Sequence, residues 1–112
     1  MAIPHAIPGQ IVDLFPADDT LPTANSYALF KSAELELIRL VLPAGKSFRS
    51  HSVAGEITVQ CLTGVIDFDI EGRSQILRAG QLLHVAAGVA HGLVGVEDAS
   101  ALLTIVLHRA PV

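Results

Sequence analysis

Short segments in which hydrophobic and polar residues alternate run through most of the chain and predict β-strands. Between Val65 and Ile70, apolar side chains alternate with two aspartates, so one face of the segment is apolar and the other is polar. Similar reasoning predicts strands over 34–42, 57–62, 75–78, 82–85, 91–96 and 102–108, with a hairpin turn over 71–74. Shorter strands are expected near 10–14 and 26–29. No segment has the sustained periodicity of about 3.6 residues that indicates a helix, so helix should be minor.

Turns that contain glycine separate these strands at intervals of about 8–12 residues, which is typical of an all-β sandwich or barrel. A closed barrel is favoured because closure hides the strand edges. The 112 residues are enough for one domain, which we expect over 29–112. Residues 1–28 are predicted to form an extended N-terminal arm, because their four prolines exclude a helix interior. The apolar residues of this arm need cover from the sheet or from a second subunit, and a homodimer is therefore predicted.

Composition indicates a cytoplasmic protein that does not enter a membrane. Hydrophobic residues make up 51% of the chain, yet no uninterrupted apolar run reaches the roughly 18 residues of a membrane span. The first residues lack the basic and apolar pattern of a secretory signal. Cys61 is the single cysteine, so no disulfide can form within the chain, which fits a reducing compartment.

The charge pattern argues against a nucleic-acid partner. The formal net charge is -4, and the seven lysines and arginines are scattered along the sequence. Binding to phosphate groups needs a concentrated positive face. A small-molecule ligand is the partner that the remaining features favour.

Two histidines follow glycine-containing turns and are the clearest candidates for chemistry. His51 comes six positions after Gly45, and His91 comes three positions after Gly88, which ends the segment that begins at Gly80. Each histidine is placed at a strand end with apolar residues nearby. We therefore predict that the two imidazoles share one pocket.

These two segments resemble the signature motifs of the cupins, a family of small double-sheet β-barrels also described as jelly rolls or double-stranded β-helices. The first cupin motif runs glycine, five residues, His-x-His, three or four residues, glutamate, six residues, glycine, and Gly45, His51 and Gly64 match it. The second runs glycine, five residues, Pro-x-Gly, two residues, histidine, three residues, asparagine, and Gly80, Gly88 and His91 match that. The resemblance spans close to half of the chain, and it implies an all-β cupin barrel.

The resemblance also implies a metal site, and here the chain departs from the family. In cupins the two histidines and glutamate of the first motif and the histidine of the second usually bind one divalent metal. His51 and His91 take the first and last places, but Val53 stands at the second histidine position and Ile57 at the glutamate position. Glu56 is one residue early, and neighbouring strand residues face opposite ways. A bulge near Gly55 would be needed to return Glu56 to the pocket.

Several residues remain candidates for the pocket. A metal such as Fe, Mn, Ni or Zn would need a third ligand beside the two histidines, and Glu56, His84 and Cys61 are the alternatives. The structural alternatives are an outward side chain for His84, a hydrogen-bonding role at a strand end for Glu56, and a small buried hydrophobe for Cys61. On parity, one strand face carries the pocket-lining candidates Ile57, Val59 and Cys61.

Three functional hypotheses follow. The first is a stand-alone cupin that binds a small molecule inside the barrel, with His51 and His91 as polar anchors. The second is a metal-dependent cupin enzyme of the dioxygenase, isomerase or decarboxylase type, with the metal on the two histidines and either Glu56 or His84. The third is a dimeric interaction module with a vestigial pocket. No catalytic residue is assigned, because no serine nucleophile elbow or phosphate-binding loop is present.

Overall fold

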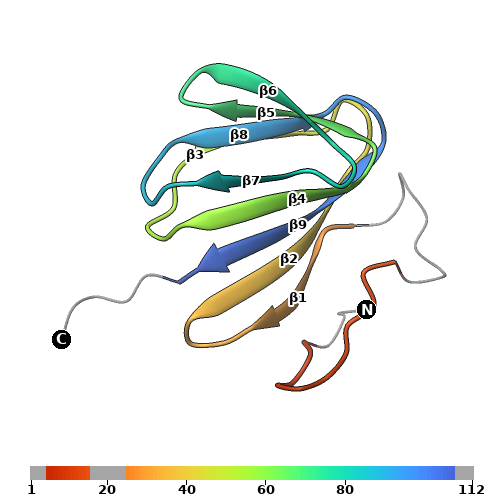
Figure 1. Cartoon of the computed structure of the whole chain (residues 1–112), viewed down its shortest axis with the longest axis vertical. Coiled ribbons are helices and arrows are strands. Elements are labelled where there is room, and N and C mark those ends of the chain that lie inside the picture. The colour runs from red at the N-terminus through yellow and green to blue at the C-terminus, as the bar shows by residue number, and fades with distance from the viewer. Residues whose placement is uncertain (1–4, 16–24, 108–112) are drawn as a thin grey trace.

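Two antiparallel sheets face one another and enclose the core (Figure 1). The computed structural model describes residues 5–15 and 25–107, and in these ranges it contains nine strands and no helix. The five-stranded sheet has the order β1-β2-β9-β4-β7, and the four-stranded sheet has the order β3-β8-β5-β6. The strands are β1 (Tyr27–Lys31), β2 (Leu35–Leu42), β3 (Ser47–His51), β4 (Ile57–Thr63), β5 (Val65–Ile70), β6 (Arg73–Arg78), β7 (Leu82–Val85), β8 (His91–Gly95) and β9 (Ala99–Val106).

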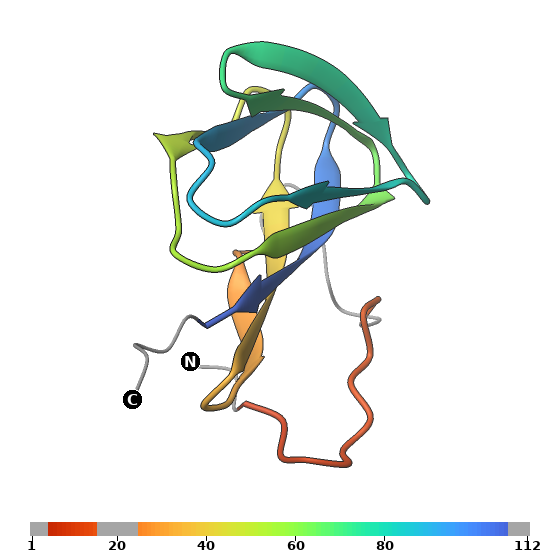
Figure 2. The same ribbon diagram turned by 60° about the vertical axis from the view of Figure 1, so that its left-hand side comes forward.

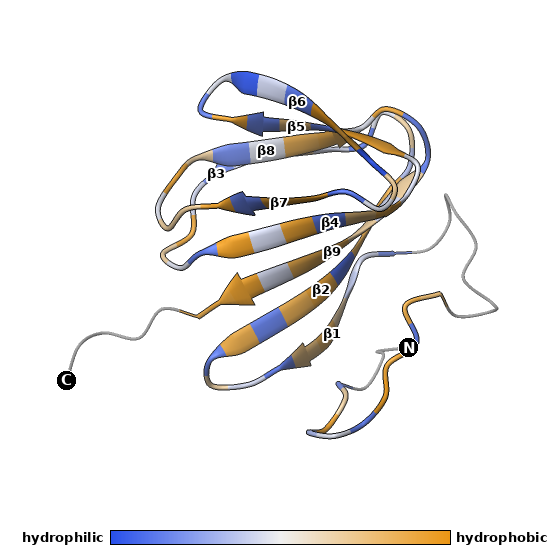
Figure 3. Cartoon of the chain, viewed as in Figure 1, coloured by the Kyte–Doolittle hydropathy of each residue, from blue (hydrophilic) through white to orange (hydrophobic). Residues whose placement is uncertain are grey.

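The order of the strands confirms the all-β jelly-roll prediction. Strands that lie side by side are mostly distant in sequence, and β9 lies between β2 and β4, while β8 lies between β3 and β5. The alternation read from the sequence sets which side chains face inward. Ile66 and Phe68 are fully buried, and the aspartates between and beside them lie on the opposite face of β5. Figure 3 shows this mixture of polar and apolar positions along the strands.

The inner face of the five-stranded sheet is built in straight rows, because β2, β9 and β4 pair without a shift over most of their length. One row joins Ile38, Leu103 and Val59. The row nearer the start of β4 joins Glu36, Ile105 and Ile57, and the row on the other side joins Leu40, Ala101 and Cys61. The apolar residues of these rows pack against the inward side chains of the four-stranded sheet and form the hydrophobic core. The core therefore lies between the two sheets.

Most strand predictions are confirmed within one to three residues, and four details differ. The sequence pattern places His51 at a strand end without bounds for that strand, which the structure forms as β3. No strand forms over 10–14, and the backbone there joins neither sheet. The β5–β6 hairpin is tighter than predicted, because Ile70 pairs directly with Arg73 and both intervening residues have positive φ, 49° at Glu71 and 83° at Gly72. β9 begins earlier than predicted, and its expected end at His108 lies outside the described residues.

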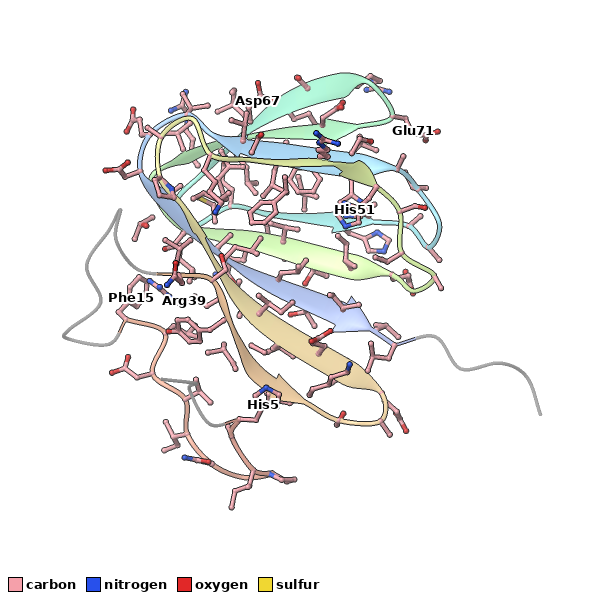
Figure 4. All side chains as sticks on the ribbon, turned by 180° about the vertical axis from the view of Figure 1, so that it is seen from behind. His5, Phe15, Arg39, His51, Asp67 and Glu71 are labelled. Atoms are coloured by element: carbon pink, nitrogen blue, oxygen red, sulfur yellow. The ribbon has the colours of Figure 1, made fainter. Side chains whose placement is uncertain are left out.

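The described part of the N-terminal arm runs beside the edge of the five-stranded sheet (Figure 2). Its backbone is tied to β1 by a hydrogen bond from Ala6 N to Leu29 O, at 2.8 Å. It is tied to β2 by Arg39, whose Nε donates to the carbonyl oxygen of Leu14 at 2.8 Å. Arg39 is buried beneath this segment, and Figure 4 shows Arg39 next to Phe15. The described residues contain no helix that could cross a membrane.

Gly55 is required by a close approach between backbones just before β4. A methyl group at this position would lie 1.7 Å from the carbonyl oxygen of Val106. The contact forms because Val106 N donates a hydrogen bond to Glu56 O at 3.0 Å, which draws the end of β9 against this loop. No side chain can be accommodated here without moving one of the two backbones.

We expect Gly55→Ala to lower the free energy of unfolding by about 3 kcal/mol, because overpacking against backbone is costly. Urea denaturation followed by circular dichroism measures this change. Ala54→Ser, at the exposed neighbouring position, is the control and should stay within about 0.5 kcal/mol of the wild type. Equal stabilities for the two variants would contradict the close approach.

Candidate functional site

A β-bulge in β3 sets the direction of His51. On the β3–β8 ladder Phe48 pairs with Leu93, and the next recorded pair is His51 with His91. Three steps along β3 therefore match two steps along β8, so β3 holds one extra residue between these pairs. In a regular strand, residues three apart face opposite sides of the sheet. The bulge removes that opposition, and both Phe48 and His51 line the interior cavity.

Gly92 provides the space for this bulge. A methyl group on Gly92 would lie 3.0 Å from both the Phe48 carbonyl oxygen and the Ser50 nitrogen, and 3.2 Å from the Ser50 Cα. These atoms belong to the bulged segment of β3. A side chain at position 92 would therefore push against backbone that cannot turn aside, and glycine lets the two strands approach closely.

The bulge brings two imidazoles from adjacent strands into contact. The ring centroids of His51 and His91 are 4.6 Å apart, and the ring planes are inclined by 52°. His91 is buried and lies nearly parallel to Phe68, with ring centroids 6.0 Å apart. His51 is exposed at the end of β3, between the two sheets (Figure 4). One imidazole therefore lies inside the barrel and the other lies at its mouth.

Each ring makes the same kind of hydrogen bond, from its Nδ1 to the backbone carbonyl oxygen two residues earlier. The Nδ1 atom of His51 lies 3.1 Å from the carbonyl oxygen of Arg49, and Nδ1 of His91 lies 3.0 Å from that of Val89. A carbonyl oxygen can only accept, so each Nδ1 must carry the proton. In the neutral form of each ring, Nε2 is then left with a free lone pair.

The cavity beside the two imidazoles is mostly apolar. It has a volume of about 230 Å³ and lies between the two sheets. His51 and His91 are polar, and the other ten lining residues are hydrophobic. These ten are Ile38, Leu40, Phe48, Val53, Ile57, Val59, Phe68, Leu93, Leu103 and Ile105.

The structure places five of the sequence-predicted pocket residues on this lining: His51, Val53, Ile57, Val59 and His91. Cys61 has the same inward parity but lies one row deeper, where it is fully buried in the core and does not line the cavity. Its thiol donates hydrogen bonds to the carbonyl oxygens of Thr63 and Gly64. Burial raises the pKa of the Cys61 thiol. Cys61 therefore stays a protonated core residue at neutral pH.

Glu56 and His84 lie together on the outside of the barrel, away from the two imidazoles. His84 Nε2 is 2.7 Å from Glu56 Oε1, and the side chains are 56% and 60% exposed. β4 pairs regularly with β7 over 57–60 and with β9 over 57–61, so no bulge at the start of β4 turns Glu56 inward. Gly55 instead allows the close approach of the Val106 carbonyl oxygen. The ion pair is too exposed to contribute much to stability.

The donor set does not fit a metal centre of the enzymatic type. Such a site commonly has three protein ligands and an open position. Among the described residues, no group of three histidine, cysteine, aspartate or glutamate side chains comes together. Beside the two imidazoles, Val53 and Ile57 contribute hydrocarbon to the lining.

Comparison with known proteins agrees with this architecture. A family profile described as "Cupin domain" matches residues 38–107. A conserved SPY1581 protein of unknown function from Streptococcus pyogenes has a similar structure, with a TM-score of 0.76, 25% identity, and coverage of 98% of this chain and 97% of that one. A cupin superfamily protein from Desulfitobacterium hafniense DCB-2 has a TM-score of 0.73 at 17% identity, covering 88% of this chain and 100% of its own.

One similar structure is that of an enzyme. DMSP lyase DddQ from Ruegeria pomeroyi DSS-3 has a TM-score of 0.67 at 26% identity. The match covers 78% of this chain but 49% of the lyase chain. No curated protein sequence matches this chain.

The hydrogen bonds predict the tautomer of each histidine. At alkaline pH, where the rings are neutral, His51 and His91 should carry the proton on Nδ1. His84 should carry it on Nε2, because that atom faces the Glu56 carboxylate. Long-range ¹H–¹⁵N correlation spectra distinguish the two forms directly. An Nε2–H tautomer at His51 or His91 would rule out the bond to the backbone carbonyl.

Gly92→Ala should displace the β3 bulge and move His51 away from His91. We expect a loss of about 1–3 kcal/mol of stability from overpacking, together with a large change in the His51 ring chemical shifts. Val94→Ala is the matched control, because Val94 lies two residues along the same strand and on the same face. That variant should leave the His51 shifts in place, and similar shift changes in both variants would contradict the role of Gly92.

Proposed function

This chain belongs to the cupin domain family, and from its cavity we propose that it binds a small molecule inside the barrel, with His51 and His91 as the polar anchors. The observation that supports the proposal is a mostly hydrophobic cavity that carries two adjacent polar groups at one end. Ligand sites of globular proteins commonly combine an apolar lining with a few convergent polar groups. Fold alone does not choose among cupin functions, so the proposal rests on this site.

The size of the cavity suits a compact ligand. Its volume of about 230 Å³ exceeds the roughly 150 Å³ of an engineered apolar cavity that binds benzene. A molecule built around one substituted ring would therefore fit. The exposed ring of His51 lies at the end from which such a ligand would enter, and the buried ring of His91 lies further in.

The alternative of a metal-dependent cupin enzyme has less support in this chain. It needs a third ligand, and Glu56 and His84 are bound to one another on the outer surface. The similar lyase structure extends well beyond the region that this chain matches. An oxygen-activating or Lewis-acid centre would therefore need ligands other than those proposed from the motif positions.

Blocking the mouth of the cavity tests the binding proposal. Val53 is half-buried on the lining, so Val53→Trp should fill the entrance and weaken toluene binding at least about tenfold, since the ring would occupy the ligand's space. Toluene is a suitable probe because it matches the apolar lining. Binding is measured by NMR titration of the cavity methyl groups.

Ser52→Trp is the matched control for this experiment. Ser52 is the exposed neighbour of Val53 and does not line the cavity, so this variant should bind toluene as the wild type does. Failure of toluene to bind the wild-type protein, or equal binding by both tryptophan variants, would refute the proposal.

Association through the arm remains a prediction. Ile7, Ile11 and Phe15 leave 70%, 92% and 56% of their surface exposed, which is unusual for large apolar side chains in one short segment. If a second copy covers them, deleting residues 1–14 should convert a dimer to a monomer in sedimentation analysis. An unchanged oligomeric state after deletion would refute a role of the arm in association.

A further inference from the structure

We infer that the cavity selects an uncharged ligand whose head group donates a hydrogen bond, such as an alcohol or a primary amide on a compact hydrocarbon body. The inference deepens the proposed function and rests on it. It follows from the hydrogen bonds that fix the two imidazoles, together with the chemistry of the remaining lining.

The two histidines present acceptors to a ligand. Each Nδ1–H is used by a backbone carbonyl, 3.1 Å away at His51 and 3.0 Å away at His91. Nδ1 and Nε2 lie on opposite sides of the ring Cε1, so Nε2 points away from the carbonyl that holds the ring. Two neutral rings on the cavity lining, with centroids 4.6 Å apart, therefore each leave one Nε2 lone pair as an acceptor.

A head group that only accepts hydrogen bonds is unsuited to this arrangement. A carbonyl, a nitrile or a carboxylate would place its own lone pairs against those of Nε2. A hydroxyl can donate its proton to one Nε2, and a primary amide can donate one proton to each ring. The site therefore favours a ligand head group that donates a hydrogen bond.

The lining also disfavours a charged head group. The lining contains no carboxylate that would compensate an ammonium group, and burying an unpaired ion is costly. At the same end of the sheet, Glu36 occupies the β2 position in the row of Ile105, and Lys31 is its cross-strand partner on β1. These two side chains are opposite in charge, so this pair favours neither a cationic nor an anionic ligand. A neutral donor meets both conditions.

Three probes of similar size separate the contributions. Benzyl alcohol donates a hydrogen bond, benzonitrile only accepts one, and toluene has no polar head group. Binding of each probe to the full chain is measured by methyl NMR titration at alkaline pH in the presence of EDTA. We expect benzyl alcohol to bind about tenfold more tightly than benzonitrile, as one net hydrogen bond would give.

Removing one acceptor tests whether the preference comes from the imidazoles. His51→Ala changes an exposed side chain and should weaken benzyl alcohol by roughly three- to tenfold while leaving toluene within about twofold. His84→Ala makes the same substitution on the outer surface and should change neither. A general loss of structure would weaken toluene as well, so the pair of probes separates a polar contact from damage to the cavity.

The outcomes distinguish this inference from the proposed function. If toluene does not bind the wild-type protein, both fail. If toluene binds but benzonitrile binds as well as benzyl alcohol, or His51→Ala leaves the affinity for benzyl alcohol unchanged, the selectivity inference alone is overturned. A preference for benzyl alcohol that appears only after a divalent metal replaces EDTA would also overturn it, because the head group would then contact the metal.

Discussion

The extra residue in β3 is the constraint on which the site depends. Strand geometry fixes side-chain direction with a period of two, so the odd spacing between Phe48 and His51 would otherwise send the two side chains to opposite faces. The bulge lets the phenyl ring and the imidazole face the same cavity, and Gly92 gives β3 the room to adopt it. Without the bulge, His51 would face away from the cavity, and His91 would be left as the one imidazole on its lining.

The sheet opposite the bulge is regular where it lines the cavity. On the opposite sheet, β2, β9 and β4 align in register, and their inward side chains give the cavity a continuous hydrocarbon wall. Glycine is used where backbones approach closely, at Gly55 against Val106 and at Gly92 against β3. The structure thus combines a rigid apolar wall on one side with a distorted, polar strand end on the other. This combination favours holding a ligand in one orientation.

Much of the fold could be predicted from the sequence because alternation and glycine turns are local signals. β5 and β7 have the predicted bounds, and the motif spacing identified the barrel. The convergence of His51 and His91 was also predicted from those spacings. The bulge was not, because it depends on how β3 pairs with β8, and a bulge was sought instead at Gly55, where the structure has a close backbone contact.

Whether a residue lines the cavity depends on how deep it lies between the sheets as well as on which way its side chain faces. Cys61 has the same parity as Val59, yet the cavity ends before it, and periodicity carries no information on depth. Phe48, Phe68 and Leu103 were missed as lining residues because they come from strands without a motif histidine or from positions before the bulge. Their apolar character alone marked them as core, which most inward residues of a barrel are.

The convergence of the two imidazoles is tested most directly by a nuclear Overhauser spectrum of the wild-type protein. With ring centroids 4.6 Å apart, cross-peaks between the ring protons of His51 and His91 are predicted. Cross-peaks from the His51 ring to the α-protons of Gly92, whose neighbours on β8 face the interior, with none to the His91 ring, would show that His51 faces outward and would contradict this account of the site.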